Sequence, residues 1–325
     1  MRRVVALLVL GAAPLAAQAP GVTAREVTVG AAPALPGTLL LPAGHATGPA
    51  VVLVHGSGPH DRDESVGATK PFRDLALGLA ARGVAVLRYE KRTRVAPFSF
   101  IGRRYTVDAE VVDDAVAAVA LLRAEPRIDG RRVVVVGHSL GGMLAPRIAA
   151  RDGGLAGIAI LAGATTRSLV AMVDDQLAYL AALPDADTAA LAASRRSFAA
   201  IGQRIAALTP GDTLDTAPIG GAPPSYWYDL SRYDMAATLR PQRLPVLLMQ
   251  GGRDYQVTLA DLDAFLATLG PRRDLVVKRY AALDHLFVPG EGASRPSDYD
   301  RGGFVDVQVI DDLAAWVKRR SPARP

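Results

Sequence analysis

The segment Gly137–Gly142, with the sequence GHSLGG, constrains the fold of this chain more than any other. It directly follows four consecutive valines, which are typical of a strand buried on both faces, and it precedes a helical pattern over residues 140–151. A serine held on so tight a strand-to-helix turn has crowded backbone neighbours, so Gly137 and Gly141 are needed for clearance. The segment predicts an α/β chain in which the Ser139 hydroxyl stands at the edge of a parallel sheet.

The rest of the chain alternates between strand and helix patterns, which supports a mostly parallel sheet with helices on both faces. The predicted strands are 26–29, 38–41, 50–54, 84–87, 133–136, 158–161, 246–249 and 275–280, and the predicted helices are 72–82, 107–123, 140–151, 259–269 and 305–319. The first two strands are expected to be antiparallel, joined by a turn that contains Pro33, Pro36 and Gly37.

The alternation stops between residues 167 and 243, where helical spacing, a Pro/Gly-rich loop and the aromatic run Tyr226–Tyr228 replace strands. We therefore divide the chain into a core, residues 20–166 and 244–325, and a helical cap insertion, residues 167–243. The insertion could simply add packing, but a lid over the carboxyl ends of the strands is the favoured interpretation, because α/β sheets bind ligands there.

Composition excludes several classes of protein. Half of the residues are apolar and 21% are charged, so the chain can bury a large core and is not a disordered protein. The absence of cysteine excludes disulfide scaffolds and thiolate chemistry. The net charge of +5 is scattered along the chain, so we expect no nucleic-acid partner. No metal-binding or dinucleotide-binding motif occurs, and we predict no metal and no cofactor.

The N-terminus has the pattern of a secretory signal peptide. Arg2 and Arg3 precede an apolar run, and Ala17-Gln18-Ala19 offers cleavage after Ala19 or, alternatively, after Ala17. The run is too short to span a bilayer, so no stable membrane anchor is expected. We predict that residues 1–19 are a signal peptide and that the mature protein is periplasmic or extracellular.

A serine nucleophile needs a base and an acid to orient that base. His285 is the only histidine after Ser139, and in enzymes with this turn the base comes last in the chain. Asp254 directly follows the strand 246–249 and is the predicted acid. Asp261 and Asp263, on the next helix, are expected to face water. His138 is expected to point away from the nucleophile.

The oxyanion formed during acyl transfer needs two amide donors. The amide of Leu140, at the start of the helix after the turn, is one candidate. The loop His55–Pro59 after the strand 50–54 supplies the other, with Ser57 preferred and Gly58 second. The charged loop His60–Glu64 is expected to be solvated or paired internally.

Several segments resemble the serine α/β-hydrolase superfamily, and within it the bacterial esterases of the dienelactone-hydrolase-like, acyl-esterase group. They are the turn around Ser139, the segments HGSGP at 55–59, DRD at 61–63, KPFRDLA at 70–76, RYEKRT at 88–93 and QGGRDYQV at 250–257, and the pair Tyr226-Trp227. The resemblance covers nearly all of the mature chain. It implies the α/β-hydrolase fold with an eight-stranded sheet, a helical cap, and a triad of Ser139, Asp254 and His285 without a cofactor. Glu90 stands where such proteins often have Asp, away from the triad.

The sequence therefore predicts a serine carboxylesterase that hydrolyses short-to-medium acyl esters of small molecules. Trp227, Tyr228 and Tyr255 are the candidate substrate-binding residues. The alternatives are a serine peptidase or amidase, or an acyl-thioester hydrolase, with the same triad. A more remote alternative is a non-catalytic binding protein of the same fold. The sequence does not determine the oligomeric state.

Overall fold

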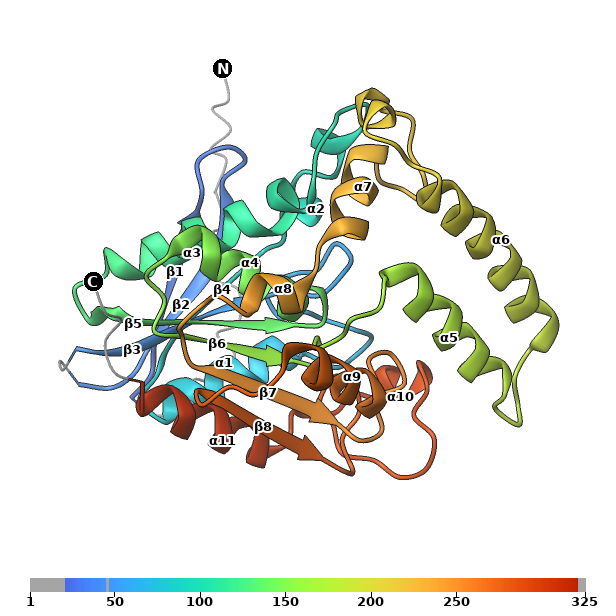
Figure 1. The fold of residues 1–325 in the computed structure, drawn as a ribbon. Helices are drawn as coiled ribbons and strands as arrows, with labels where there is room; N and C mark the ends of the chain where they lie inside the picture. Colours follow the sequence, from blue (N-terminus) through green and yellow to red (C-terminus); the bar gives the residue numbers. More distant parts are fainter. Residues whose placement is uncertain (1–20, 45–46, 321–325) are drawn as a thin grey trace, which may run out of the picture.

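The computed structural model describes residues 21–44 and 47–320, so the predicted signal peptide lies outside the described residues. Its centre is one eight-stranded sheet with the strand order β1-β2-β4-β3-β5-β6-β7-β8 (Figure 1). The strands are β1 (Thr23–Val29), β2 (Leu35–Leu41), β3 (Gly48–Val54), β4 (Ala85–Tyr89), β5 (Ile128–His138), β6 (Gly157–Leu161), β7 (Val246–Gly251) and β8 (Leu275–Tyr280). From β4 to β8 all neighbouring strands are parallel, whereas β2 is antiparallel to both β1 and β4.

Helices connect and cover the strands. They are α1 (Pro71–Ala81), α2 (Arg92–Val95), η1 (Pro97–Phe100), η2 (Asp108–Val112), α3 (Asp113–Arg123), α4 (Leu140–Asp152), α5 (Leu169–Ala181), α6 (Thr188–Ala206), η3 (Gly211–Leu214), α7 (Pro224–Arg232), α8 (Met235–Leu239), α9 (Leu259–Leu269), α10 (Ser297–Asp300) and α11 (Val307–Lys318). The prediction of an α/β fold with helices on both faces of a mostly parallel sheet is confirmed.

The alternation of side chains along the central strands explains the two layers of helices. In β5, Val133 and Val135 belong to the core on one face, with α3, α4 and α9, while Val134 and Val136 belong to the core on the other, with α1 and α11. Both faces need apolar side chains, so the strand is a run of valines without polar alternation. Figure 1 shows α1 and α11 on the opposite side of the sheet from α3 and α4.

Two local expectations were wrong. Pro36 and Gly37 lie inside β2 and not in the turn before it, because β2 begins at Leu35. Gly37 is needed there, since a side chain would meet the backbone carbonyl of Arg88 on the neighbouring strand. Asp261 does not face water but is buried at the start of α9, where it caps the helix with Thr258 and pairs with Arg167.

Only helices occur between β6 and β7 in this part of the described chain, namely α5, α6, η3, α7 and α8. In Figure 1, α5 and α6 stand away from the sheet, on the side toward which β5, β6, β7 and β8 point. The carboxyl ends of these parallel strands therefore face the helical segment, and the loops that follow them hold the candidate site.

Candidate active site

The backbone at Ser139 has the geometry expected of a nucleophile on a tight turn. Ser139 joins β5 to α4 with φ 50° and ψ −118°, a conformation that residues other than glycine rarely adopt. A side chain at Gly137 would collide with the backbone of Gly141, and one at Gly141 would collide with the carbonyl of Val54. These two glycines allow β5, α4 and β3 to approach closely enough to hold Ser139 in its strained conformation.

A buried, hydrogen-bonded pair of side chains lies in the loops after β7 and β8. His285 Nδ1 lies 2.8 Å from Asp254 Oδ2, and both residues are buried. The carboxylate of Asp254 also accepts hydrogen bonds from Gln250 Nε2 and from the amides of Gln256 and Val257, at 2.8–3.0 Å. Because four donors fix the carboxylate, its Oδ2 holds the His285 ring with Nδ1 protonated and Nε2 available as a base.

Ser139 and His285 line one cavity of about 200 Å³, together with Ser57, Gly56 and Gln256. The structure thus brings together residues from the ends of β3, β5 and β8, which are far apart in the sequence. Asp254 contacts this cavity through His285. The arrangement places a hydroxyl, an imidazole and the loop after β3 around a space that suits a small reacting group.

The two predicted oxyanion amides are free to bind a ligand. Among the described residues, neither the amide of Leu140 nor that of Ser57 donates a hydrogen bond. Leu140 is the first residue of α4, so its N–H lies at the positive end of a helix of 13 residues. Ser57 lies in the wall of the cavity that Ser139 lines. Both amides are therefore candidates for holding a negative oxygen.

His138 and Glu64 were not recognised as parts of the site. His138 does not point away, because its ring lies 4.7 Å from the His285 ring, centre to centre, and its Nε2 lies 3.0 Å from the His285 carbonyl oxygen. Its Nδ1 lies 3.0 Å from the buried carboxylate of Glu64. One ring nitrogen faces a carbonyl oxygen and the other a carboxylate oxygen, an environment that favours the protonated ring.

The pKa shifts of this pair agree with the charged state. Burial alone would lower the pKa of His138, but the Glu64 carboxylate outweighs burial and raises it. Burial alone would raise the pKa of Glu64, yet His138 lowers it to about 2. The last residue of the loop His60–Glu64 is thus buried, and it pairs with His138 outside the loop rather than with a residue inside it. A charged loop close to a Gly-rich turn was the only signal of this in the sequence.

The three predicted substrate-binding residues lie in different cavities. Trp227 lines an apolar cavity of about 600 Å³ that also reaches Ser57. Tyr255 lines a separate cavity with Asp254 and stacks on Tyr179 of α5, with ring centres 4.9 Å apart. Tyr228 lines neither of these cavities nor the one at Ser139. The structure therefore connects Trp227 to the site through Ser57 and does not bring Tyr228 to it.

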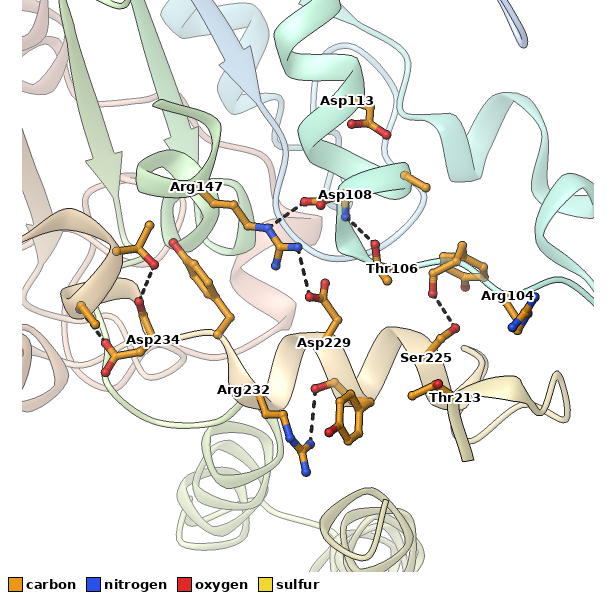
Figure 2. A pocket seen from close by; sticks show the side chains of 16 residues that line it. Arg104, Thr106, Asp108, Asp113, Arg147, Thr213, Ser225, Asp229, Arg232 and Asp234 are labelled. Atoms are coloured by element: carbon orange, nitrogen blue, oxygen red, sulfur yellow. Dashed lines mark hydrogen bonds and ion pairs between the residues drawn. The ribbon is translucent and has the colours of Figure 1, made fainter. Parts of the chain in front are cut away.

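Tyr228 instead lines a larger cavity of about 1120 Å³ between η2 and α7 (Figure 2). The Arg232 guanidinium lies 3.5 Å from the centre of the Tyr228 ring. Arg147, at the centre of the view, pairs with Asp108 at 2.7 Å and with Asp229 at 3.0 Å. Arg151 also lies 3.5 Å from Asp108, so the two carboxylates on this wall face two guanidinium groups.

Residues 21–44 and 47–320 contain no group of three or more His, Cys, Asp or Glu side chains arranged to hold a metal. None of the helices in these ranges has the length and hydropathy of a membrane span.

The chain is similar in sequence and in fold to known proteins. Residues 51–299 match the model of the alpha/beta hydrolase family. The chain is 40% identical to Esterase EstD of Thermotoga maritima over 297 residues, which cover 90% of this chain and 67% of that protein. Among solved structures, it is similar in fold to 2,6-dihydroxy-pseudo-oxynicotine hydrolase, with a TM-score of 0.56, 17% identity, and coverage of 94% of this chain and 71% of that one.

A dienelactone hydrolase from Anabaena variabilis is also similar in fold, with a TM-score of 0.53 and 17% identity over 94% of this chain and 100% of that one. These two likenesses concern the fold alone. The family model covers most of the chain, and the relative from Thermotoga maritima is similar over nearly all of it. The chain belongs to the alpha/beta hydrolase family.

Proposed function

We propose that this protein is a serine carboxylesterase that hydrolyses short-to-medium acyl esters through an acyl-enzyme. The observation that supports this most directly is the cavity lined by Ser139 and His285, with Asp254 bonded to the far side of the imidazole. The 40% identity to a protein named an esterase supports the same reaction class.

In the proposed mechanism, the Ser139 oxygen attacks the ester carbonyl carbon and His285 Nε2 takes the hydroxyl proton. The carbonyl oxygen becomes an oxyanion, which the amides of Leu140 and Ser57 bind. When the carbon–oxygen bond to the alcohol breaks, His285 returns the proton to the leaving alkoxide. Water then repeats the sequence on the acyl-enzyme, with His285 as base and then acid, and releases the carboxylic acid and free Ser139. Asp254 fixes the imidazole and stabilises its protonated form.

We assign the acyl chain to the cavity that extends from Ser57 to Trp227. Its volume of about 600 Å³ lies within the usual range for small-molecule sites, and Phe100, Ile101 and Tyr226 contribute apolar walls. Leu169 of α5 and Trp227 of α7 both line it, so residues 167–243 would act as a cap over the substrate. These features favour a small ester with an apolar chain.

The test is hydrolysis of p-nitrophenyl acetate, butyrate and laurate by the full chain and by Ser139→Ala. We expect the native protein to cleave the shorter esters and the variant to lose this activity. Measurable hydrolysis at equal rates by the two folded proteins would refute the assignment of Ser139. If neither cleaves esters but a fluorophosphonate labels Ser139, a peptidase or thioesterase would replace the esterase. A folded protein that remains unlabelled would indicate a non-catalytic binding protein.

We also propose that residues 1–19 direct export, on the basis of their sequence pattern alone. Expression of the full chain in a bacterium with two membranes, followed by N-terminal sequencing of the periplasmic fraction, tests this. A periplasmic protein that begins at residue 18 or 20 would support export, and an uncleaved cytoplasmic protein would contradict it.

A further inference from the structure

The peptide group between Gly56 and Ser57 carries one of the two candidate oxyanion donors. In a trans peptide the carbonyl of one residue and the N–H of the next point in opposite directions. The direction of the Gly56 carbonyl therefore determines whether the Ser57 N–H faces the site. If this peptide rotated by half a turn, a carbonyl oxygen would replace the N–H and would repel a developing oxyanion.

Glycine at position 56 makes such a rotation easy. A Cβ there would lie 3.1 Å from Ser139 Cβ and 3.2 Å from the Glu64 carboxylate, so any other residue would push these neighbours apart by a few tenths of an ångström. Glycine also accepts backbone conformations that other residues resist, so it does not itself hold the orientation of the next peptide. Gly56 thus lets the loop pack against Ser139, but another group must hold the orientation of the Gly56–Ser57 peptide.

Lys91 supplies that constraint. Its Nζ donates a hydrogen bond of 2.8 Å to the Gly56 carbonyl oxygen and lies 2.9 Å from Glu110 Oε1. The Lys91 side chain is only 3% exposed. Burying an ammonium group is costly unless it is well paired, and a methionine would fill the same space without that cost. The charge is therefore explained by what it binds, namely the Gly56 carbonyl and the Glu110 carboxylate.

The Gly56 residue is held from its other side as well. Its own N–H donates to Glu64 Oε1 at 2.5 Å. Glu64 fixes the peptide before Gly56, and Lys91 fixes the peptide after it. With both neighbouring peptide planes held by buried charged groups, the Ser57 N–H has one direction available, away from Lys91.

We propose that Lys91, with Glu110 as its counter-ion, is a positioning residue that keeps the Ser57 N–H directed at the oxyanion. It acts through the Gly56 carbonyl and contacts neither the substrate nor the reacting atoms. The inference rests on the proposed function, since it assigns Lys91 a task in the same reaction. Lys91 belongs to the segment RYEKRT at 88–93, which contains no residue of the proposed triad.

The test compares Lys91→Met/Glu110→Gln with the native protein. The double change removes both charges, so that no unpaired charge is left in the interior. Active sites are counted by titration with a fluorophosphonate, and kcat is expressed per titrated serine. We expect kcat and kcat/KM to fall together by about 10- to 100-fold, less than the 100- to 1000-fold that follows loss of an oxyanion donor itself.

The matched control is Arg123→Met/Asp152→Asn. This pair is joined by two hydrogen bonds of 2.6 Å. Its carboxylate is buried, its guanidinium is 32% exposed, and it lies at the end of the sheet opposite the candidate site. It should lose thermal stability and keep the native kcat per titrated serine. A general effect of removing a buried ion pair would instead lower kcat in both double variants and would overturn the inference.

A rescue experiment separates positioning from folding. The natural chain has no cysteine, so Lys91→Cys creates a single thiol. Alkylation with 2-bromoethylamine in denaturant, followed by refolding, produces a side chain close to lysine in length and charge. We expect the modified variant to regain most of the kcat of native protein taken through the same cycle, and the unmodified variant to stay low.

The inference and the proposed function fail in different ways. Native hydrolysis by Ser139→Ala would overturn the proposed function. A native kcat per titrated serine in the folded Lys91→Met/Glu110→Gln variant would overturn only the assignment of Lys91. A fall in kcat that aminoethylation does not reverse would also contradict it.

Discussion

His55, the first residue of the loop that carries the proposed oxyanion donor Ser57, should make the stability of this protein depend on pH. It follows β3 and is buried, with its ring packed against Phe72 and Tyr89 at centre distances of 5.2 and 5.3 Å. Its Nε2 lies 3.1 Å from the Asp61 carbonyl oxygen and must donate to it, which leaves Nδ1 unprotonated. Burial lowers the pKa of His55 to about 3, against the attraction of Glu64 and with further repulsion from Lys91 and His60.

The sign and size of the effect follow from this shift. In the unfolded chain a histidine has a pKa near 6.5, so below that pH the unfolded state binds a proton that the folded state refuses. The contribution of the neutral His55 ring to the free energy of unfolding is constant above pH 6.5 and falls as the pH decreases toward 3. From pH 7 to 4.5, the pH passes about two units below the unfolded-state pKa of 6.5. The free energy of unfolding should therefore fall by roughly 3 kcal/mol over this range.

The assay is urea unfolding of the native chain and of His55→Gln at several pH values from 7 to 4.5. Glutamine keeps an N–H donor for the Asp61 carbonyl but does not titrate. The free energy of unfolding of the native protein should fall by about 3 kcal/mol more than that of the variant over this range. Any loss of packing in the variant is the same at each pH and cancels in this difference. Parallel pH profiles for the two proteins would refute the reasoning.

Three further changes have defined outcomes. Trp227→Ala should move the preference among p-nitrophenyl esters toward longer acyl chains, because it enlarges the cavity next to Ser57; an unchanged profile would remove Trp227 from the substrate site. Gly141→Ala should lower the free energy of unfolding by about 3 kcal/mol or more, since the added methyl group collides with the backbone at Val54, and native thermal stability would contradict this. Asp254→Asn should reduce kcat by about 10⁴-fold by favouring the wrong tautomer of the base, and a loss of less than tenfold at neutral pH would argue against the assigned acid.

The parts of the fold that the sequence predicted are those where one local rule dominates. The central strands were recognised because burial on both faces requires apolar residues at every position, as in Val133–Val136. The turn at Ser139 was recognised because only glycine fits at 137 and 141. Where local and tertiary preferences conflict, the prediction failed. Pro36 and Gly37 suggest a turn, but their place in β2 depends on the pairing of that strand with β1 and β4.

The burial of charged residues was not predicted, because sequence patterns treat a charge as a sign of solvent. Asp261, Glu64 and Lys91 are all buried, each beside a partner of opposite charge. The partners lie between 19 and 94 residues away along the chain. A local sequence pattern does not indicate which distant residue will pair with a charge. The burial of such pairs can therefore be predicted only when the strand order is known.

The strand order also explains why the loop after β3 is the natural place for an oxyanion donor. In the sheet, β3 lies between β4 and β5, and the three strands are parallel. Their carboxyl ends therefore meet at one edge, with the loop after β3 between Lys91, which follows β4, and Ser139, which follows β5. One neighbour supplies the proposed nucleophile, and the other supplies the cation that binds the carbonyl of the peptide before Ser57. The orientation of the proposed oxyanion donor is then a property of three adjacent strands, and a change at Lys91 should affect catalysis without moving Ser139.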